Sequence, residues 1–215
     1  MGYGAAQSVL KLFIAVMLTL GVAKAESVTI AALGDSLTQG YGLPVDQGLV
    51  PTLERWLQNQ GQDVRIMNAG VSGDTTAGGL ARIDWTLTPD VQGLIVALGA
   101  NDMLRGLPPE AAKNNLDGIL EAAKRAGIPA LLVGVPAPSN YGSEYKDEFD
   151  GIFPALAKKH NAIFALNLLA PLESSEVPLT DLLQSDRLHP NAQGVELIVN
   201  GLAPYVLNLI EEIRR

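Results

Sequence analysis

The 215-residue chain contains no cysteine, which excludes disulfide bonds, thiolate metal sites and a cysteine nucleophile. Histidine is scarce, with two residues, and aromatic side chains make up only 5% of the chain. The 15 lysines and arginines are outnumbered by 23 acids, for a formal net charge of −8. An acidic chain without a basic cluster disfavours nucleic acid and anionic lipid headgroups as main partners. Internal repeats, low-complexity tracts and Gly/Ser linkers are also absent, so we expect a single domain.

The N-terminal 25 residues are expected to lie outside this domain. An apolar run at 12–23 follows Lys11, and residues 23–25 (Ala-Lys-Ala) match the small-residue pattern of a cleavage site. The run is too short to span a bilayer comfortably, which is typical of a secretory signal peptide, although an uncleaved N-terminal anchor is the alternative. We therefore expect a signal peptide over 1–25, a domain over 26–215, and a periplasmic or secreted protein without stable membrane insertion.

Apolar runs alternate with longer amphipathic segments through the rest of the chain. This alternation predicts βαβ units, with a parallel sheet between layers of helices. The run at 94–98 is apolar throughout, as expected for a strand buried on both faces. Strands are expected at 28–33, 64–69, 94–98, 130–135 and 162–166, and helices at 49–57, 109–126, 143–160 and from Pro190 onward.

A serine stands where the first expected strand ends. The Gly-Asp-Ser-Leu run at 34–37 directly follows the strand at 28–33. Open α/β folds place their sites at the carboxyl edge of the sheet, so Ser36 is a candidate nucleophile. The run also fits a plain turn, and the assignment therefore depends on whether other segments supply the groups that a nucleophilic serine needs.

A serine hydroxyl needs an adjacent base, usually histidine, to act as a nucleophile at neutral pH. His160 stands at a polar helix end, where a cation near the helix C-terminus is the simpler explanation. His189 precedes Pro190, which favours an extended or turn backbone, and Asp186 lies three residues earlier. A carboxylate on one ring nitrogen fixes the tautomer and leaves the other nitrogen free to take a proton. The alternative is that Asp186 is a local cap and His189 a surface residue.

Two loops that follow strand ends could supply donors for an oxyanion. Gly73 lies in a glycine-containing loop after the second strand, where a backbone N–H can point into a cleft. Asn101 follows the third strand and offers a side-chain amide. One backbone N–H and one carboxamide are typical oxyanion donors, although both loops also fit ordinary turns.

Three aspartates accompany these loops, at positions 35, 74 and 102. No histidine or further acid stands near them at metal-ligand spacing. We therefore expect no metal there. Asp35, Asp74 and Asp102 are instead expected to hold the loops through hydrogen bonds from their side chains to the backbone.

Four segments, taken in order, resemble the four blocks of the SGNH hydrolases, also called GDSL esterases/lipases. They are Gly34-Asp35-Ser36-Leu37, Gly73, Gly99-Ala100-Asn101-Asp102 and Asp186-Arg187-Leu188-His189. The resemblance covers essentially the whole expected domain. Further stretches are similar to the bacterial periplasmic thioesterase, lysophospholipase and arylesterase branch, at 72–76, 79–82, 101–106 and 140–142.

The resemblance implies a three-layer α/β/α sandwich with a flavodoxin-like parallel sheet of about five strands. It also implies that Ser36 is the nucleophile, His189 the base and Asp186 its orienting acid. The N–H groups of Ser36 and Gly73 and the amide of Asn101 would then form the oxyanion hole. The implied enzyme is a cofactor-free and metal-free monomer that hydrolyses small aryl or acyl esters, with thioesters and lysophospholipids as further candidate substrates.

Other functions stay open on the sequence. The same family contains carbohydrate-ester deacetylases, although few aromatic residues are available to stack on sugars. A catalytically inactive flavodoxin-like binding module would have lost reacting groups that this chain retains, and Asp35 beside the first loop disfavours a flavin phosphate. Apolar loop residues form an acyl groove or simply pack the loops; they are Leu43, Met103, Leu104, Leu107, Tyr141 and Tyr145.

Overall fold

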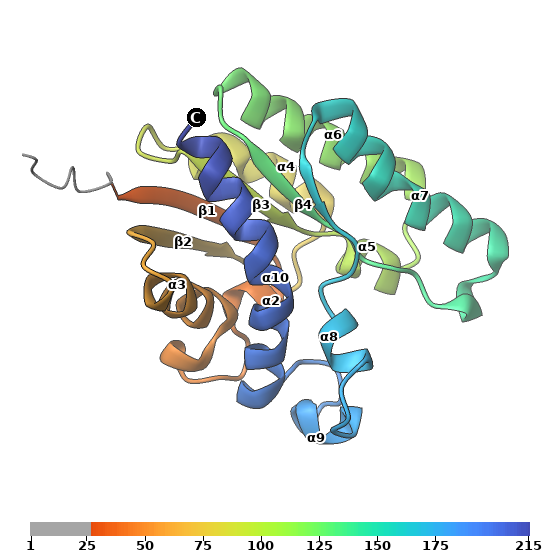
Figure 1. Ribbon diagram of the computed structural model, residues 1–215. Helices are drawn as coiled ribbons and strands as arrows, with labels where there is room; N and C mark the ends of the chain where they lie inside the picture. Colours follow the sequence, from red (N-terminus) through yellow and green to blue (C-terminus); the bar gives the residue numbers. More distant parts are fainter. Residues whose placement is uncertain (1–26) are drawn as a thin grey trace, which may run out of the picture.

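The computed structural model of the protein describes residues 27–215, so the expected signal peptide lies outside the described residues. In this range one parallel sheet has the strand order β2-β1-β3-β4-β5 and crosses the middle of the molecule (Figure 1). The strands are β1 (Val28–Gly34), β2 (Val64–Gly70), β3 (Gly93–Ala97), β4 (Ala130–Val133) and β5 (Ile163–Ala165). This order is that of flavodoxin-like sheets, which confirms the expected fold class.

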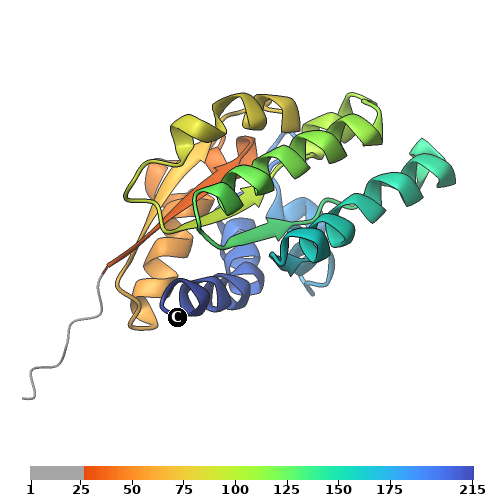
Figure 2. The ribbon, with the colours of Figure 1, turned by 90° about the horizontal axis from the view of Figure 1, so that it is seen from above.

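Helices cover both faces of the sheet (Figure 2). One face carries α3 (Leu49–Asn59) and α10 (Ala192–Ile213), which pack against each other. The other face carries α4 (Thr76–Thr86), α6 (Pro109–Arg125) and α7 (Ser143–His160), with α6 between the other two. Shorter helices in the loops are α2 (Ser36–Gln39), α5 (Ala100–Leu104), α8 (Ala170–Glu173), α9 (Leu179–Leu182) and the 3-10 turns η1 (Val45–Gln47) and η2 (Ser139–Tyr141).

Alternate residues of each strand point to opposite faces and so build two separate cores. In β1, Ile30 and Ala32 belong to the core beneath α3 and α10, whereas Ala31 and Leu33 belong to the core beneath α4, α6 and α7. The same alternation continues in β3 and β4. Because both faces are covered, the central strands need apolar residues at every position, which explains the unbroken apolar run in β3.

Sequence patterns located the long helices well and missed α4. The 143–160 helix is found as expected, while α10 begins at Ala192 because Asn191 caps it by accepting the N–H of Gly194 at 3.0 Å. Helix α4 contains Gly78 and Gly79, which lower intrinsic helix propensity. It forms because packing against α6 and β1 outweighs that cost. Among residues 27–215, no helix is both long and apolar enough to cross a membrane.

Candidate active site

Ser36 is the first residue of α2, directly beyond the carboxyl end of β1. Asp35 caps this one-turn helix, with Oδ1 accepting the N–H of Leu37 at 3.0 Å. Only a glycine fits before it, because a Cβ at Gly34 would lie 1.9 Å from Oγ1 of Thr38. Strands β2 and β3 pair with opposite edges of β1, so the strand order reverses at β1. The serine hydroxyl therefore lies at the topological switch point of the sheet.

The side chains of His189 and Ser36 are in contact although they lie 153 residues apart in the sequence. Its Nε2 lies 2.9 Å from Oγ of Ser36, and its Nδ1 lies 2.7 Å from Oδ2 of Asp186. Asp186 Oδ1 also accepts the backbone N–H groups of Leu188 and His189, which closes a tight turn. Arg187 adopts the left-handed conformation (φ 57°) that this turn requires. The turn thus aligns carboxylate, imidazole and hydroxyl in one row.

Asp186 remains a carboxylate across the neutral range. The hydrogen bond from the His189 ring, followed by those from the backbone N–H groups of Leu188 and His189, lowers the pKa of Asp186 to about 2. A negative carboxylate at Nδ1 favours the tautomer with its proton on that nitrogen. The free lone pair of the imidazole then lies on Nε2, which faces the serine hydroxyl.

Two residues that the sequence analysis did not select support the histidine. The ring centroid of Tyr41 lies 4.7 Å from that of the imidazole, and the two ring planes are tilted by 41°. Gln184 Nε2 donates to the carbonyls of Tyr41 at 2.8 Å and Pro190 at 3.0 Å, and the Gln184 N–H donates to the His189 carbonyl at 2.8 Å. Gln184 therefore joins the segment after the serine to the segment that carries the histidine. No sequence signal marked it, since its partners lie far apart in the chain.

Gly73 and Asn101 lie at the same edge of the sheet as Ser36. Gly73 follows β2 in a loop where its φ of 78° favours glycine. Asn101 lies in the first turn of α5, after β3. Together with Ser36 and His189, both line one cavity of about 510 Å³. The arrangement places a hydroxyl, an imidazole and two kinds of hydrogen-bond donor around a single volume.

Asp35 is the second carboxylate of the site, and its environment is opposite to that of Asp186. Its side chain is buried, and Asn101 Nδ2 donates to its Oδ2 at 3.4 Å. Burial raises the pKa of Asp35 above its ordinary value, although the Leu37 N–H and His189 oppose the shift. Asp35 thus orients the Asn101 amide while capping the helix of the serine.

The other two aspartates also hold loops. Asp102, 1% exposed, accepts the N–H of Thr76 at 2.8 Å and the Oγ1 hydrogen of Thr76 at 2.6 Å, which ties α5 to the start of α4. Asp74 differs from the expectation, because its side chain accepts a hydrogen bond from the Arg82 guanidinium of α4 at 2.7 Å, which is a side-chain and not a backbone donor. Within the described part of the chain, no group of three or more acids and histidines could hold a metal ion. His160 lies at the end of α7, 2.6 Å from Asp117, and does not line the cavity.

The cavity walls are mainly apolar. Of the six loop residues considered for an acyl groove, Met103 and Leu104 line this cavity. The other four do not, and Tyr145 instead packs against the core and donates to the Leu107 carbonyl at 3.0 Å. Further apolar lining comes from α2, from the ends of β3 and β4 and from the segments around α8 and His189: Leu37, Ala97, Val133, Val135, Pro136, Leu168, Leu169 and Leu188. The sequence analysis did not identify these residues, because an apolar residue that lines a cavity at a strand end is of the same residue type as one that packs in the core.

Comparison with known proteins gives a consistent family assignment. The model of the GDSL-like Lipase/Acylhydrolase family matches residues 32–197. An arylesterase of Vibrio mimicus is 34% identical over 86% of this chain and 90% of the relative. Esterase TesA of Pseudomonas aeruginosa is 34% identical over 90% of this chain and 94% of the relative. An Escherichia coli protein named thioesterase 1/protease 1/lysophospholipase L1 is also 34% identical, over 91% of this chain and 90% of the relative.

Solved structures agree with this assignment. AlinE4, described as an SGNH-hydrolase family esterase, is 47% identical, with a TM-score of 0.71 over 85% of this chain and 96% of that chain. The psychrotrophic esterase EstA from Pseudoalteromonas sp., in a structure inhibited by monoethylphosphonate, is 30% identical, with a TM-score of 0.78 over 85% of this chain and 98% of that chain.

The raised pKa of Asp35 predicts a stability effect that does not depend on catalysis. The folded protein binds a proton at Asp35 more tightly than the unfolded chain, so this group lowers stability as pH rises through its titration range. Asp35→Asn stays neutral and still offers an acceptor for the Leu37 N–H. We expect the stability of the variant relative to that of the wild type to be highest near pH 7, to decrease as pH falls and to level off below about pH 4.

Urea unfolding from pH 3.5 to pH 8 measures this difference. Asp147→Asn, at an exposed position on α7, is the matched control and should follow the wild-type curve. A stability difference between Asp35→Asn and the wild type that does not change with pH would contradict the assignment of a raised pKa to Asp35.

Proposed function

The chain belongs to the GDSL-like lipase/acylhydrolase family, and we propose that it hydrolyses carboxylic esters through an acyl-enzyme formed on Ser36. The observation that carries the proposal is the row of Ser36 Oγ, His189 Nε2, His189 Nδ1 and Asp186 Oδ2, with contacts of 2.9 and 2.7 Å. The names of the relatives, arylesterase, esterase and thioesterase/lysophospholipase, support the same reaction class. Neither carbohydrate-ester deacetylation nor an inactive binding module is favoured by them.

The proposed reaction has two half-steps. Ser36 Oγ attacks the acyl carbonyl while His189 Nε2 takes its proton, and the carbonyl electrons move onto the oxygen. The N–H groups of Ser36 and Gly73 and the amide of Asn101 bind this oxyanion. The tetrahedral adduct collapses, His189 protonates the departing alcohol or thiol, and the acyl group stays on Ser36. Water then repeats the sequence, which releases a carboxylic acid and restores the serine.

The cavity indicates which part of the ester is held most closely. Its lining is mainly aliphatic, and it begins at the serine. We therefore propose that it holds the acyl chain, which gains about 0.8 kcal/mol for each methylene that it buries. Aryl and acyl esters fit this proposal, and the thioester and lysophospholipid substrates named for one relative are further candidates.

Ser36→Ala tests the nucleophile. Removal of Oγ is expected to lower turnover of p-nitrophenyl esters by at least about 10³-fold and to leave the fold unchanged. A fluorophosphonate probe should label the wild type covalently and leave the variant unlabelled, by analogy with the phosphonate-inhibited relative. The same panel should include esters of increasing acyl length, an acyl-CoA and a lysophospholipid, because their relative kcat/KM values define the acyl preference.

Ser72→Ala is the matched control, because this serine lies in the neighbouring loop and also lines the cavity. It should retain fluorophosphonate labelling. Undiminished turnover by a folded Ser36→Ala protein, or labelling that persists in it, would reject Ser36 as the nucleophile.

Asp186→Asn tests the orienting acid. An amide at this position can donate to Nδ1, which would place the imidazole proton on Nε2 and block proton transfer from Ser36. We expect kcat to fall by roughly 10³- to 10⁴-fold, with little change in KM. Asp181→Asn, an exposed residue on the nearby helix α9, serves as the control and should retain wild-type kcat. A kcat for Asp186→Asn within tenfold of the wild type would argue against the role of Asp186.

We also propose that residues 1–25 direct export and are removed between Ala25 and Glu26. The support is the sequence alone: an apolar run of signal-peptide length behind a lysine, followed by a small-residue cleavage pattern. Mass spectrometry of the protein recovered from the periplasm of an expressing bacterium should give a mature chain that begins at Glu26. Full-length protein held in the membrane fraction would instead support the uncleaved anchor.

A further inference from the structure

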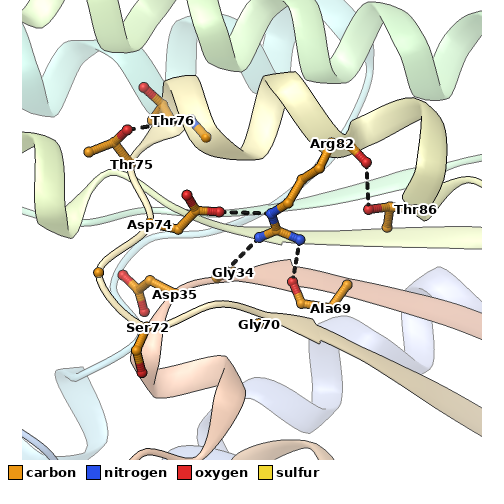
Figure 3. A network of polar contacts seen from close by, with 12 residues as sticks. Gly34, Asp35, Ala69, Gly70, Ser72, Asp74, Thr75, Thr76, Arg82 and Thr86 are labelled. Carbon is orange, nitrogen blue, oxygen red and sulfur yellow. Dashed lines mark hydrogen bonds and ion pairs between the residues drawn. The ribbon is translucent and has the colours of Figure 1, made fainter.

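Arg82 extends from α4 toward Asp74 and toward the ends of β1 and β2 at Gly34 and Ala69 (Figure 3). Its guanidinium makes three hydrogen bonds in one plane: Nε to Asp74 Oδ2 at 2.7 Å, Nη1 to the Ala69 carbonyl at 2.7 Å and Nη2 to the Gly34 carbonyl at 3.0 Å. These acceptors belong to the end of β1, the end of β2 and the loop that follows β2. None of them lies on α4 itself.

The pair formed by Arg82 and Asp74 is largely shielded from water. The side chains are 23% and 15% exposed, so their charge-assisted hydrogen bonds are stronger than those of a surface ion pair. Helix α4 also leaves space for the carboxylate, since a Cβ at Gly78 would lie 1.8 Å from Asp74 Oδ1. Gly78, one of the two glycines that lower the helix propensity of α4, thus leaves room for the ion pair.

The three acceptors are the points that define the geometry between nucleophile and oxyanion donor. Gly34 lies two residues before Ser36, and its carbonyl also accepts the N–H of Val71 at 3.1 Å. Asp74 directly follows Gly73, and Ala69 lies where β2 enters the loop. A planar guanidinium presents its donors at fixed angles, so it fixes the carbonyls of Gly34 and Ala69 and the carboxylate of Asp74 relative to one another.

Two other contacts hold the loop from its exposed side. Gln39 Oε1 accepts the N–H of Ser72 at 3.1 Å, and Arg105 Nη2 donates to the Gly73 carbonyl at 2.6 Å. Both come from more exposed side chains, and neither touches a strand carbonyl. Arg82 alone among these three connects the loop to the ends of both β1 and β2.

We propose that Arg82 is a positioning residue for ester hydrolysis, one that sets the Gly73 N–H at hydrogen-bond distance from the oxyanion formed on attack by Ser36. The inference rests on the proposed function. Oxyanion donors act at 2.7–3.1 Å from the developing charge, and a displacement of about 1 Å can cost on the order of 100-fold in rate. Loss of Arg82 should therefore weaken transition-state binding while leaving substrate binding in the apolar cavity intact.

Arg82→Ala and Arg82→Lys test this role, with kcat normalised to the sites that a fluorophosphonate titrates. We expect Arg82→Ala to lose about 100-fold in kcat with KM within about threefold of wild type. Arg82→Lys should lose about tenfold, because an ammonium keeps the charge opposite Asp74 and cannot reach all three acceptors. Millimolar guanidinium should restore part of the kcat of Arg82→Ala and leave the wild type unchanged.

An alkylboronic acid gives a readout that a purely structural role would not move. It forms a tetrahedral adduct with the serine Oγ and places an oxygen where the oxyanion forms. Its affinity should fall in each Arg82 variant by about the same factor as kcat/KM. The acid limb of the pH profile should keep its midpoint, because the contact between His189 and Asp186 is not altered.

Arg65→Ala is the matched control, since Arg65 lies on β2 and its side chain, within residues 27–215, makes only a long contact of 3.9 Å with Asp90. It should keep kcat within about twofold of wild type, as is usual for exposed positions.

Two results would overturn the inference. One is wild-type kcat and wild-type boronate affinity in folded Arg82→Lys, and the other is a loss of thermal stability in the Arg82 variants with unchanged kcat per titrated site. If Arg82→Ala does not fold, the Arg82→Lys variant alone decides the test. If Ser36→Ala stays active, the proposed function fails and the inference with it, whereas a dead Ser36→Ala beside fully active Arg82 variants rejects the inference alone.

Discussion

The pairing of β1 with strands on both of its sides is the constraint on which the site depends. Backbone hydrogen bonds hold Gly34 in register with Gly70 of β2 and with Ala97 of β3. Because all three strands are parallel, their carboxyl ends meet at one edge of the sheet, and the segments that carry Ser36, Gly73 and Asn101 leave from that edge. The two apolar cores keep this register, since a slip of one residue would turn core side chains toward the wrong face.

Side-chain contacts then refine what the strand pairing brings together. Asp35 caps the helix of Ser36 and receives the Asn101 amide, and Arg82 connects the ends of β1 and β2 to the Gly73 loop. Gln184 connects the histidine segment to Tyr41. Apart from the Asp35 cap, these contacts join segments that are distant in sequence, so the tertiary structure holds the candidate reacting groups together with their own local turns. Such support is what a preorganised hydrolytic site requires.

Two aspartates of the site show how environment assigns different tasks to one residue type. Asp186 lies near solvent, accepts three hydrogen bonds and has its pKa lowered to about 2, so it stays charged beside the imidazole. Asp35 is buried, and desolvation raises its pKa. Their positions in the Gly-Asp-Ser-Leu and Asp-Arg-Leu-His runs do not distinguish them in this respect. The difference comes from burial and donor count, which only the folded chain defines.

The fold class and the candidate reacting residues could be predicted from the amino-acid sequence alone, because apolar periodicity and strand-end glycines are local properties. The alternating runs predicted the parallel sheet, and the spacing of Asp186 and His189 predicted a carboxylate beside an imidazole. Helix α4 was missed, since Gly78 and Gly79 oppose helix formation locally and packing against α6 outweighs them. The roles of Arg82, Gln184 and most of the cavity lining emerge only in the folded chain, because Arg82 reaches Gly34 and Gln184 reaches Tyr41 across segments that no local pattern links.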